Sequence, residues 1–424
     1  MTATEGSRPA PPAAPSGDRA RVAGLVAVLA VLGVLAVVTG TVPAVAFVLA
    51  IVLCVMIHEA GHYVAARRSG MKVTEFFFGF GPALWSVRRG ETTYGIKAVP
   101  AGGYVRIIGM SNLETDIDPA DEPRTYRRAS YPRRLAVALA GVATHFVIAF
   151  VLLMVMWTVV GFPRYDRTLT VGSVGDGSPA AAAGFEAGDR LVAVDGQPIE
   201  SWESLPPYIQ ARPGEPVRLV VERDGRRVSI DAVPAAANPL GEPVGYLGIG
   251  PALATSTDRV GPVAAVGRSL DSIGEITVGS VRGLASFFSP DSLSSYGGRL
   301  FGDRPPSGEV SGGDAGRPVS LVGIVRLADQ AANAESGLFL FLSLVVLLNI
   351  FLAILNLVPL PPFDGGHVAL ATYERLRTRK GQAPYRADAS KLMPLTAAVV
   401  AALVVLGGSA ILLDLTDPLA NPFG

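Results

Sequence analysis

The sequence predicts an α-helical membrane protein that crosses the bilayer four or five times and carries an inserted α+β domain. Of its 424 residues, 50% are hydrophobic and only 17% are charged, whereas about 25% are charged in ordinary soluble proteins. Lys plus Arg and Asp plus Glu number 36 each, so no basic excess indicates nucleic-acid binding. The chain is also too apolar to be intrinsically disordered as a whole.

Four uncharged regions are long enough to cross a hydrocarbon core, which takes roughly 20 residues per helix. The first has 36 residues, and the break at Gly40-Thr41-Val42-Pro43 divides it into two helices, because glycine and proline interrupt helices. Its beginning could instead be a cleaved signal peptide, since Arg19 and Arg21 precede a short apolar run. The four regions are residues 22–57, 135–160, 337–358 and 393–413.

The charges between these regions predict the orientation, because cytoplasmic loops retain Lys and Arg. Residues 67–134 hold 12 basic and 7 acidic residues, and residues 373–391 hold 6 and 2, whereas residues 161–335 hold 15 and 21. We therefore expect the N-terminus and the two basic loops to be cytoplasmic and the long acidic segment to be extracytoplasmic. Residues 1–20, rich in proline and alanine, are expected to form a disordered cytoplasmic tail.

Two carboxylates lie at the ends of apolar runs, where ionisable residues are costly enough to be functional candidates. Glu59 lies in the motif His58-Glu59-Ala60-Gly61-His62, near the end of the second expected helix. On a helix His58 and His62 share one face, a turn apart, as two imidazoles that bind one zinc ion must. Chance explains the motif poorly, because it holds half of the chain's four histidines and lies at the end of an apolar helix.

A catalytic zinc ion takes three protein ligands and keeps one position open. The single cysteine, Cys54, excludes a thiolate cluster and is expected to be a packing residue. Asp364 is the other carboxylate at the end of a span, where prolines end the helix and Gly365-Gly366 permit a tight turn. His367 is expected to cap or orient this turn rather than to bind metal.

The motifs HExxH, at His58, and NxxPxPxxDG, which begins at Asn356, lie on separate expected membrane helices with a long extracytoplasmic segment between them. This pair resembles the site-2 protease family of intramembrane zinc metalloproteases (peptidase family M50), in particular its bacterial RseP-like branch. The resemblance covers nearly all of the chain after Pro43. It implies that His58, His62 and Asp364 bind Zn2+ and that Glu59 is the general base.

The same resemblance gives roles to two polar residues of the expected membrane helices. Asn356 is expected to help hold the substrate strand at the site. Residues 141–146, Gly-Val-Ala-Thr-His-Phe, look like the family's GPxxNF element, with Val142 in place of proline and His145 in place of asparagine. Two interpretations of His145 stay open, namely a hydrogen-bond donor to the substrate or to a zinc-bound oxygen, and a polar residue that is paired inside the helix bundle.

Residues 73–108 are expected to form a β-hairpin or small sheet, because an apolar stretch with glycine breaks precedes a loosely alternating strand at 92–99. The stretch is similar to the family's re-entrant β-element, including its GxG, so Gly79 and Gly81 are predicted to contact the substrate. Non-helical backbone is tolerated at membrane depth where protein buries it or where it lines a wet cavity. An edge strand there could pair with an unwound substrate. The alternative is a cytoplasmic hairpin on the membrane surface.

Residues 168–251 contain a short helix, a turn, a β-branched strand and an Asp-Gly turn between Ser178 and Ile199. This stretch closely resembles the core of a bacterial PDZ domain. Tyr246-Leu247-Gly248-Ile249 looks like the loop that binds a peptide carboxylate, so Tyr246 and Gly248 are predicted to bind substrate. The groove could capture a peptide terminus or act as a size filter over the active site.

The remaining segments organise the chain around these parts. Apolar residues at three- and four-residue spacing predict an amphipathic helix over residues 262–288, lying on the outer leaflet or packed on the PDZ domain. Residues 289–317, rich in Gly, Ser and Pro, are expected to be a flexible linker. The membrane domain then has two halves, residues 21–160, which end in the 135–160 helix, and residues 337–413.

The resemblance implies a multi-pass zinc metalloendopeptidase of the bacterial plasma membrane that acts in regulated intramembrane proteolysis during stress responses. Its expected partners are the lipid bilayer and single-span substrates such as anti-sigma factors, already trimmed by a site-1 protease. Two other classes remain open, a catalytically inactive PDZ-containing scaffold and a membrane zinc transporter or sensor. Transport would require further polar residues across the other spans, where only His145 and Asn349 stand out.

Overall fold

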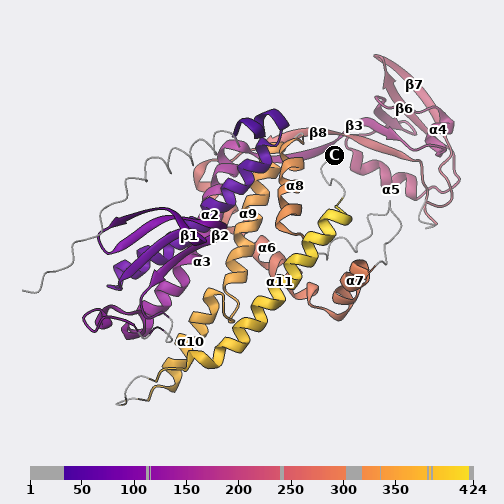
Figure 1. Cartoon of the computed structure of the whole chain (residues 1–424). Coiled ribbons are helices and arrows are strands. Elements are labelled where there is room, and N and C mark those ends of the chain that lie inside the picture. Colours follow the sequence, from indigo (N-terminus) through magenta and orange to yellow (C-terminus); the bar gives the residue numbers. More distant parts are fainter. Residues whose placement is uncertain are drawn as a thin grey trace, which may run out of the picture. The chain divides into compact units, whose positions relative to one another are not determined.

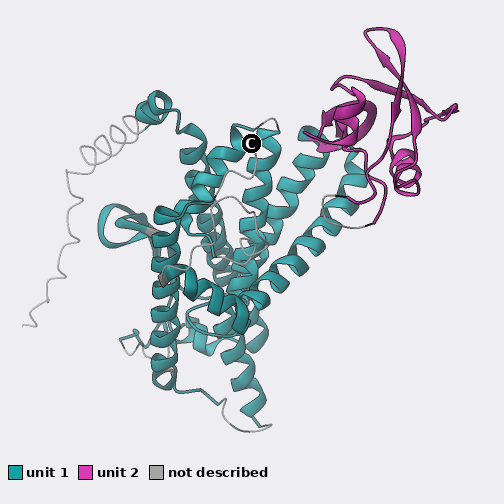
Figure 2. Ribbon diagram, turned by 90° about the vertical axis from the view of Figure 1, so that its right-hand side faces the viewer, with its two compact units in different colours: residues 1–160, 260–424 teal, residues 161–259 magenta. Residues whose placement is uncertain are grey.

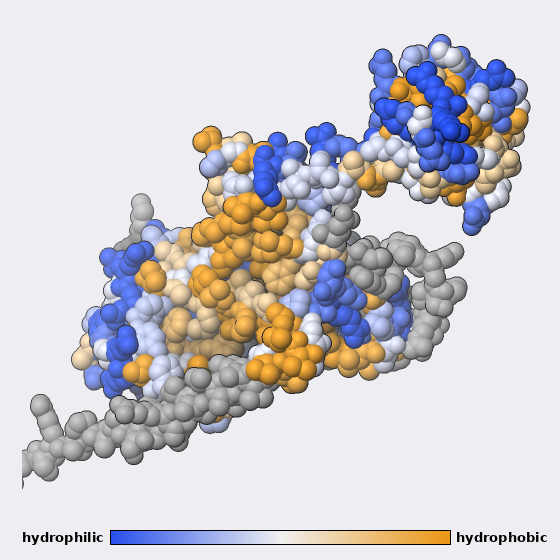
Figure 3. All heavy atoms as spheres, turned by 90° about the horizontal axis from the view of Figure 1, so that it is seen from above, coloured by the Kyte–Doolittle hydropathy of each residue, from blue (hydrophilic) through white to orange (hydrophobic). Residues whose placement is uncertain are grey.

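The computed structural model describes residues 33–419 except 111–113, 115, 239–242, 302–317, 335, 380–381 and 383–384. The chain divides into two compact units, residues 1–160 with 260–424 and residues 161–259 (Figure 2). The first unit is mainly helical and contains a β-hairpin, and the second is built on a β-sheet (Figure 1). Hydrophobic side chains gather over the middle of the first unit, whereas hydrophilic ones predominate on the visible face of the second (Figure 3).

Four helices of the described residues are long and apolar enough to cross a membrane. The predicted regions 135–160, 337–358 and 393–413 each contain one of them, and another begins at the predicted break after Gly40. The helix expected over residues 22–38 lies mostly outside the described residues, although residues 33–39 are helical. The four are α2 (Val42–Arg68), α3 (Tyr131–Val155, continued by the π-helical turn Met156–Val160), α9 (Gly337–Asn356) and α11 (Met393–Thr416).

Helix α3 is central to the first unit, where it contacts α2, α9 and α10 (Asp364–Arg377). Gly61 permits the close approach of α2 and α3, because a Cβ atom at Gly61 would lie only 2.8 Å from the Ala140 carbonyl oxygen. A second apolar contact, which includes Phe47, Ala328 and Val345, joins α2, α9 and α8 (Leu321–Ala332). These contacts bring the two sequence halves of the unit together around α3.

The helix predicted over residues 262–288 is present as α6 (Pro262–Phe287), and it packs against α3 and α9. The flexible linker expected over 289–317 is wrong for its first part, because residues Pro290–Phe301 form helix α7. The Ser289 hydroxyl accepts the Ser292 N–H at the start of this helix, and the buried Tyr296 contacts Phe287 and Ser409. The rest of the expected linker, residues 302–317, lies outside the described residues.

The expected β-hairpin is formed by β1 (Val73–Arg89) and β2 (Thr92–Ile107), which lie beside α2 (Figure 1). Both strands bend, so that Phe77 is paired with Gly95 and also with Tyr104. The register of β1 shifts on both sides of Phe80, between two glycines with positive φ angles. The depth of this hairpin in a membrane stays a prediction.

The second unit contains a sheet with the strand order β7-β6-β4-β3-β8 and with β5 paired to β4. A hairpin turn at Asp224-Gly225, both with positive φ, joins β6 to β7. The short helices α4 (Pro179–Ala183) and α5 (Leu205–Gln210) complete the unit. The strands are β3 (Phe162–Val174), β4 (Arg190–Val194), β5 (Gln197–Pro198), β6 (Val217–Arg223), β7 (Arg226–Ala232) and β8 (Ile249–Asp258).

Candidate metal centre

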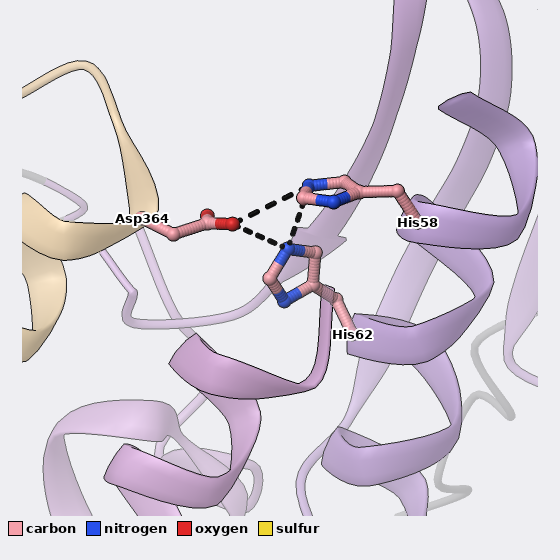
Figure 4. A group of neighbouring side chains, drawn as sticks. All are labelled: His58, His62 and Asp364. Atoms are coloured by element: carbon pink, nitrogen blue, oxygen red, sulfur yellow. Dashed lines mark hydrogen bonds and ion pairs between the residues drawn. The ribbon is translucent and has the colours of Figure 1, made fainter. Parts of the chain in front are cut away.

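Three of the predicted site residues direct their side chains to one point in the first unit (Figure 4). The Nε2 atoms of His58 and His62 are 3.2 Å apart. The Oδ2 atom of Asp364 is 3.3 Å from Nε2 of His58 and 3.2 Å from Nε2 of His62. Each residue therefore offers one potential ligand atom, and the three atoms form a nearly equilateral triangle.

Local sequence explains how these residues reach one another. His58 and His62 are one turn apart on the same face of α2. Asp364 is the first residue of α10, and it follows the turn that ends α9. Gly365 is required in this turn, because a Cβ atom there would collide with the carbonyl groups of Leu357 and Val358. The turn thus returns the carboxylate toward α2.

The triangle fits a zinc ion. A tetrahedral zinc ion with bonds of about 2.0 Å keeps its ligand atoms about 3.3 Å apart, which agrees with the three measured separations. Nδ1 of His62 lies 2.8 Å from the Val137 carbonyl oxygen, to which it can only donate. A neutral His62 ring therefore turns a lone pair on Nε2 toward Asp364 and His58. A cation between these electron-rich atoms relieves their mutual repulsion.

Gly141 of α3 leaves the space in which an ion would lie. A Cβ atom at this position would be 2.6 Å from Cε1 and 2.8 Å from Nε2 of His58, and nearer still to Nε2 of His62. Any side chain at residue 141 would therefore enter the space beside both imidazole nitrogens. In the sequence Gly141 has no predicted role beyond the GPxxNF-like element, although a glycine in the middle of an apolar helix is a signal, because alanine is the better helix former.

The charge of the Asp364 side chain also suits a metal ligand. Burial raises the pKa of the Asp364 carboxyl group, but in the metal-free site a His58 or His62 ring that carries a second proton donates to the carboxylate and attracts it, and this outweighs burial, so the net pKa lies below its usual value. The group is therefore ionised at neutral pH, as a metal ligand must be. His367, one turn further along α10, contacts the ring of Tyr126, and burial lowers the pKa of its imidazole.

Glu59 follows His58 on α2 and lies against β2. A Cβ atom at Gly103 of β2 would be 3.0 Å from Cγ of Glu59, and the backbone N–H of Val105 lies close to the Glu59 carboxylate. The hairpin thus holds this carboxylate beside the histidine pair. The sequence pointed to the hairpin as a whole, but not to Gly103 or to Val105 as its contacts with Glu59.

The other predicted site residues are more scattered. The buried His145 ring lies on His58, with ring centroids 4.8 Å apart. Asn356 is the last residue of α9 and is half-buried, and Gly79 and Gly81 lie at the bend of β1 with φ angles of +88° and +83°. Within the part of the chain that the structure describes, no hydrogen bond or ring contact joins these last three residues to the triangle.

Tyr246 and Gly248 lie in the second unit. The Tyr246 backbone forms a reciprocal pair of hydrogen bonds with Ala235, and the Gly248 carbonyl accepts the N–H of Gly175. Gly248 has a φ of +86° and is packed against Ser178, so a side chain at this position would collide with the start of α4. Binding of a peptide by this loop stays a prediction.

A buried ion pair fixes α10 against α3. Nη1 of Arg134 is 2.6 Å from Oε2 of Glu374, and the two residues are 6% and 1% exposed. Glu374 also accepts hydrogen bonds from Nη1 of Arg386 at 3.0 Å and from the Ala387 N–H at 2.9 Å. Because the carboxylate is fully paired, it is a stable anchor for the helix that begins at Asp364.

Comparison with known proteins decides the family. A family model, peptidase family M50, matches residues 46–302 and 307–400. The chain belongs to peptidase family M50. It is 34% identical over 417 residues to the zinc metalloprotease Rip1 of Mycobacterium tuberculosis, a match that covers 89% of this chain and 97% of the relative. It is also 34% identical over 409 residues to Rip1 of Mycolicibacterium smegmatis, with the same coverage.

This M50 chain is therefore a zinc metalloprotease, as the sequence predicts, with helices suited to a membrane. Among solved structures, it is similar to the PDZ domain of an SdrC-like protein from Listeria monocytogenes. That match is 27% identical, has a TM-score of 0.18, and covers 21% of this chain and 90% of the other. A TM-score this low carries no argument, so the PDZ assignment of residues 168–251 stays a prediction.

Proposed function

We propose that this M50 protease hydrolyses peptide bonds within or near the transmembrane segments of single-span membrane proteins. In this proposal His58, His62 and Asp364 bind the zinc ion and Glu59 is the general base. The observation that carries the proposal is the triangle of ligand atoms 3.2–3.3 Å apart, supplied by α2 and α10. Helix α2, which carries two of the three atoms, is long and apolar enough to cross a membrane, and this suits a substrate that arrives through the bilayer.

Zinc, when bound, supplies a Lewis acid that polarises a carbonyl group and makes water acidic enough to be deprotonated near neutral pH. The protein's own contribution is the handling of the proton. The Glu59 carboxylate takes a proton from the attacking water and delivers it to the nitrogen of the leaving amine. The Val105 N–H lies close to this carboxylate, and the absence of a side chain at Gly103 leaves room for it.

A transmembrane substrate must lose its helical hydrogen bonds before a protease can reach its backbone. The hairpin of β1 and β2 is suited to receive the unwound strand, because β2 lies directly against Glu59 and an edge strand can add an extended peptide. Positive φ angles at Gly79 and Gly81 bend β1 and shape this element. In the proposal the Asn356 amide holds the same strand from the end of α9.

Loop charge supports an extracytoplasmic position for residues 161–259, with the basic loops inside the cell. We infer that this unit is a PDZ domain that selects substrates through the loop at Tyr246 and Gly248, either by binding a peptide terminus or by excluding large outer domains. The proposed substrates are anti-sigma-factor-like regulators that a site-1 protease has already trimmed. Substrates with helix-weakening residues near the cut site should be preferred.

The test compares cells that carry the wild type, Glu59→Gln and a matched control, Glu275→Gln, whose carboxylate is exposed on α6. We expect membrane proteomics to find single-span fragments without outer domains only in the Glu59→Gln cells. The purified Glu59→Gln chain should retain one zinc ion, whereas His58→Ala should lose it. Identical proteomes under several envelope stresses, with zinc retained, would refute the proposal in favour of a scaffold. Zinc flux into proteoliposomes that survives Glu59→Gln would favour a transporter.

A further inference from the structure

Asn349 joins three elements of the helix bundle through one fully buried side chain. Its amide nitrogen donates to the Val345 carbonyl oxygen at 2.9 Å within α9 and to Sγ of Cys54 on α2 at 3.2 Å. Its amide oxygen lies 3.0 Å from Nδ1 of His145 on α3. Such a polar residue in an apolar bundle is costly to bury unless it is fully paired. Its hydrogen-bond partners therefore restrict how the side chain can be oriented.

The partners determine which way the amide faces. The Val345 carbonyl can only accept a hydrogen bond, so the NH2 group of Asn349 must face it and the oxygen must face His145. That oxygen can only accept, so Nδ1 of His145 must carry a hydrogen. A neutral His145 ring then has an unprotonated Nε2 atom. Its single N–H is engaged by Asn349 and is not available to a substrate.

The His145 ring lies against His58, whose second ring nitrogen, Nδ1, has no hydrogen bond to orient it among the described residues. Its centroid is 4.8 Å from that of His58, with the ring planes 36° apart. Nδ1 of His58 is buried and has no hydrogen-bond partner among the described residues, whereas Nδ1 of His62 donates to Val137. Metal-binding histidines are usually oriented by a hydrogen bond at the second nitrogen. At His58, contact between rings takes the place of that bond.

We propose that His145 is a positioning residue for His58 and that Asn349 holds His145 in the Nδ1–H form for this purpose. Asn349 fixes the plane of the His145 ring, and that ring supports one face of His58, so that Nε2 of His58 points toward Asp364. The inference rests on the proposed function, because it takes His58 as a zinc ligand. It replaces donation to the substrate as the role of His145.

The position of the hydrogen can be read directly by nuclear magnetic resonance. The full chain is labelled with 15N-histidine, purified in detergent and studied free of metal, and His145→Phe assigns the signals of His145. We expect the wild-type His145 ring to show a protonated Nδ1 and an unprotonated Nε2. Asn349→Leu, which removes the acceptor, should shift hydrogen to Nε2. A wild-type His145 that carries its hydrogen on Nε2 would overturn the inference.

Zinc release to a chelator tests the support of His58. We expect His145→Ala and Asn349→Leu to bind zinc about 10 to 100 times more weakly than the wild type, the usual effect of losing a residue that orients a ligand, and therefore to release it faster to a chelator. His145→Phe, which keeps a flat ring, should release zinc more slowly than His145→Ala. Ser343→Ala, which removes a hydroxyl bonded within α9 to the Phe339 carbonyl, is the matched control and should leave the rate unchanged.

The two proposals fail in different ways. If His145→Ala binds one zinc ion and releases it at the wild-type rate, the positioning role is refuted and the ligand set stays intact. A wild-type chain that binds no zinc would instead refute the ligand set. The resonance measurement needs neither zinc nor a folded alanine variant, so it still decides whether Asn349 holds the Nδ1 hydrogen of His145.

Discussion

Adding one methyl group at Gly141 is expected to abolish zinc binding while the protein stays folded. Gly141 lies in the middle of α3, and the Cβ atom of an alanine there would be 2.6 Å from Cε1 of His58. Carbon atoms in van der Waals contact are about 3.5–4.0 Å apart, so the His58 ring would have to move by about 1 Å. A zinc site tolerates changes of only about 0.2 Å in its distances.

The same substitution favours the helix itself. Alanine is more favourable than glycine in a helix interior by about 1 kcal/mol, so Gly141→Ala gains local helix stability while it closes the space for the ion. The gain in helix stability offsets part of the cost of displacing the two rings, which is about 1–3 kcal/mol for overpacking, so the metal-free protein should stay folded while zinc binding is lost. If Gly141→Ala lost zinc only because it unfolded, its zinc content and its unfolding temperature would both fall sharply.

The assay measures zinc content by mass spectrometry and thermal unfolding of the metal-free full chain in detergent. We expect Gly141→Ala to hold less than a tenth of the zinc of the wild type, to lose proteolysis, and still to unfold cooperatively within about 10 °C of the metal-free wild type. Gly274→Ala is the matched control, because a Cβ atom at this α6 position meets no atom within 4 Å. It should leave both zinc content and proteolysis unchanged.

One result would refute this reasoning. If Gly141→Ala binds one zinc ion with the affinity of the wild type, the space beside Gly141 is not the metal position. A lower unfolding temperature with zinc retained would point to the contact between α2 and α3 instead, because α3 would then be displaced as a whole.

Two further predictions concern charges that are buried away from the metal. Arg134→Met leaves the Glu374 carboxylate without its main partner and should lower the free energy of unfolding, measured by chemical denaturation, by about 3–5 kcal/mol. The double variant with Glu374→Met should recover part of this loss. In the second unit, burial raises the pKa of Asp189, but hydrogen bonds from Arg223 outweigh it, so the net pKa lies below its usual value. The stability that this carboxylate contributes is therefore complete above about pH 5 and is lost as pH falls through the lowered pKa. Protection of residues 161–259 against hydrogen exchange, corrected for the intrinsic rate, should therefore fall toward pH 3 in the wild type. It should fall less in Asp189→Asn.

Much of the site was predictable because its local part obeys helix geometry. The spacing of His58 and His62 places both on one face of any helix, and a run of apolar residues specifies that helix. Asp364 is 302 residues from His62, and no periodicity connects the two. Its place at the end of a span made it a candidate, and the family resemblance gave it a role.

Features that depend on how helices pack were not predictable in this way. Helix α7 has a composition rich in Gly and Ser, and its order comes from contacts such as Tyr296 with Ser409. Helix α8 was not predicted, and its start is fixed by Asp414 of α11, whose carboxylate accepts the Ser320 N–H at 2.7 Å. In both cases a residue more than 90 positions away supplies the decisive partner, which local patterns do not contain.

Helix α3 supplies none of the three proposed ligands, yet it contacts or supports the element that carries each of them. Arg134 pairs with Glu374 of the helix that begins at Asp364, and the Val137 carbonyl orients His62. Gly141 leaves space for an ion, and His145 lies against His58. The four α3 residues are separated by three, four and four positions, so they share one buried face. The proposed ligands come from α2 and α10, and this face of α3 sets where those ligands meet.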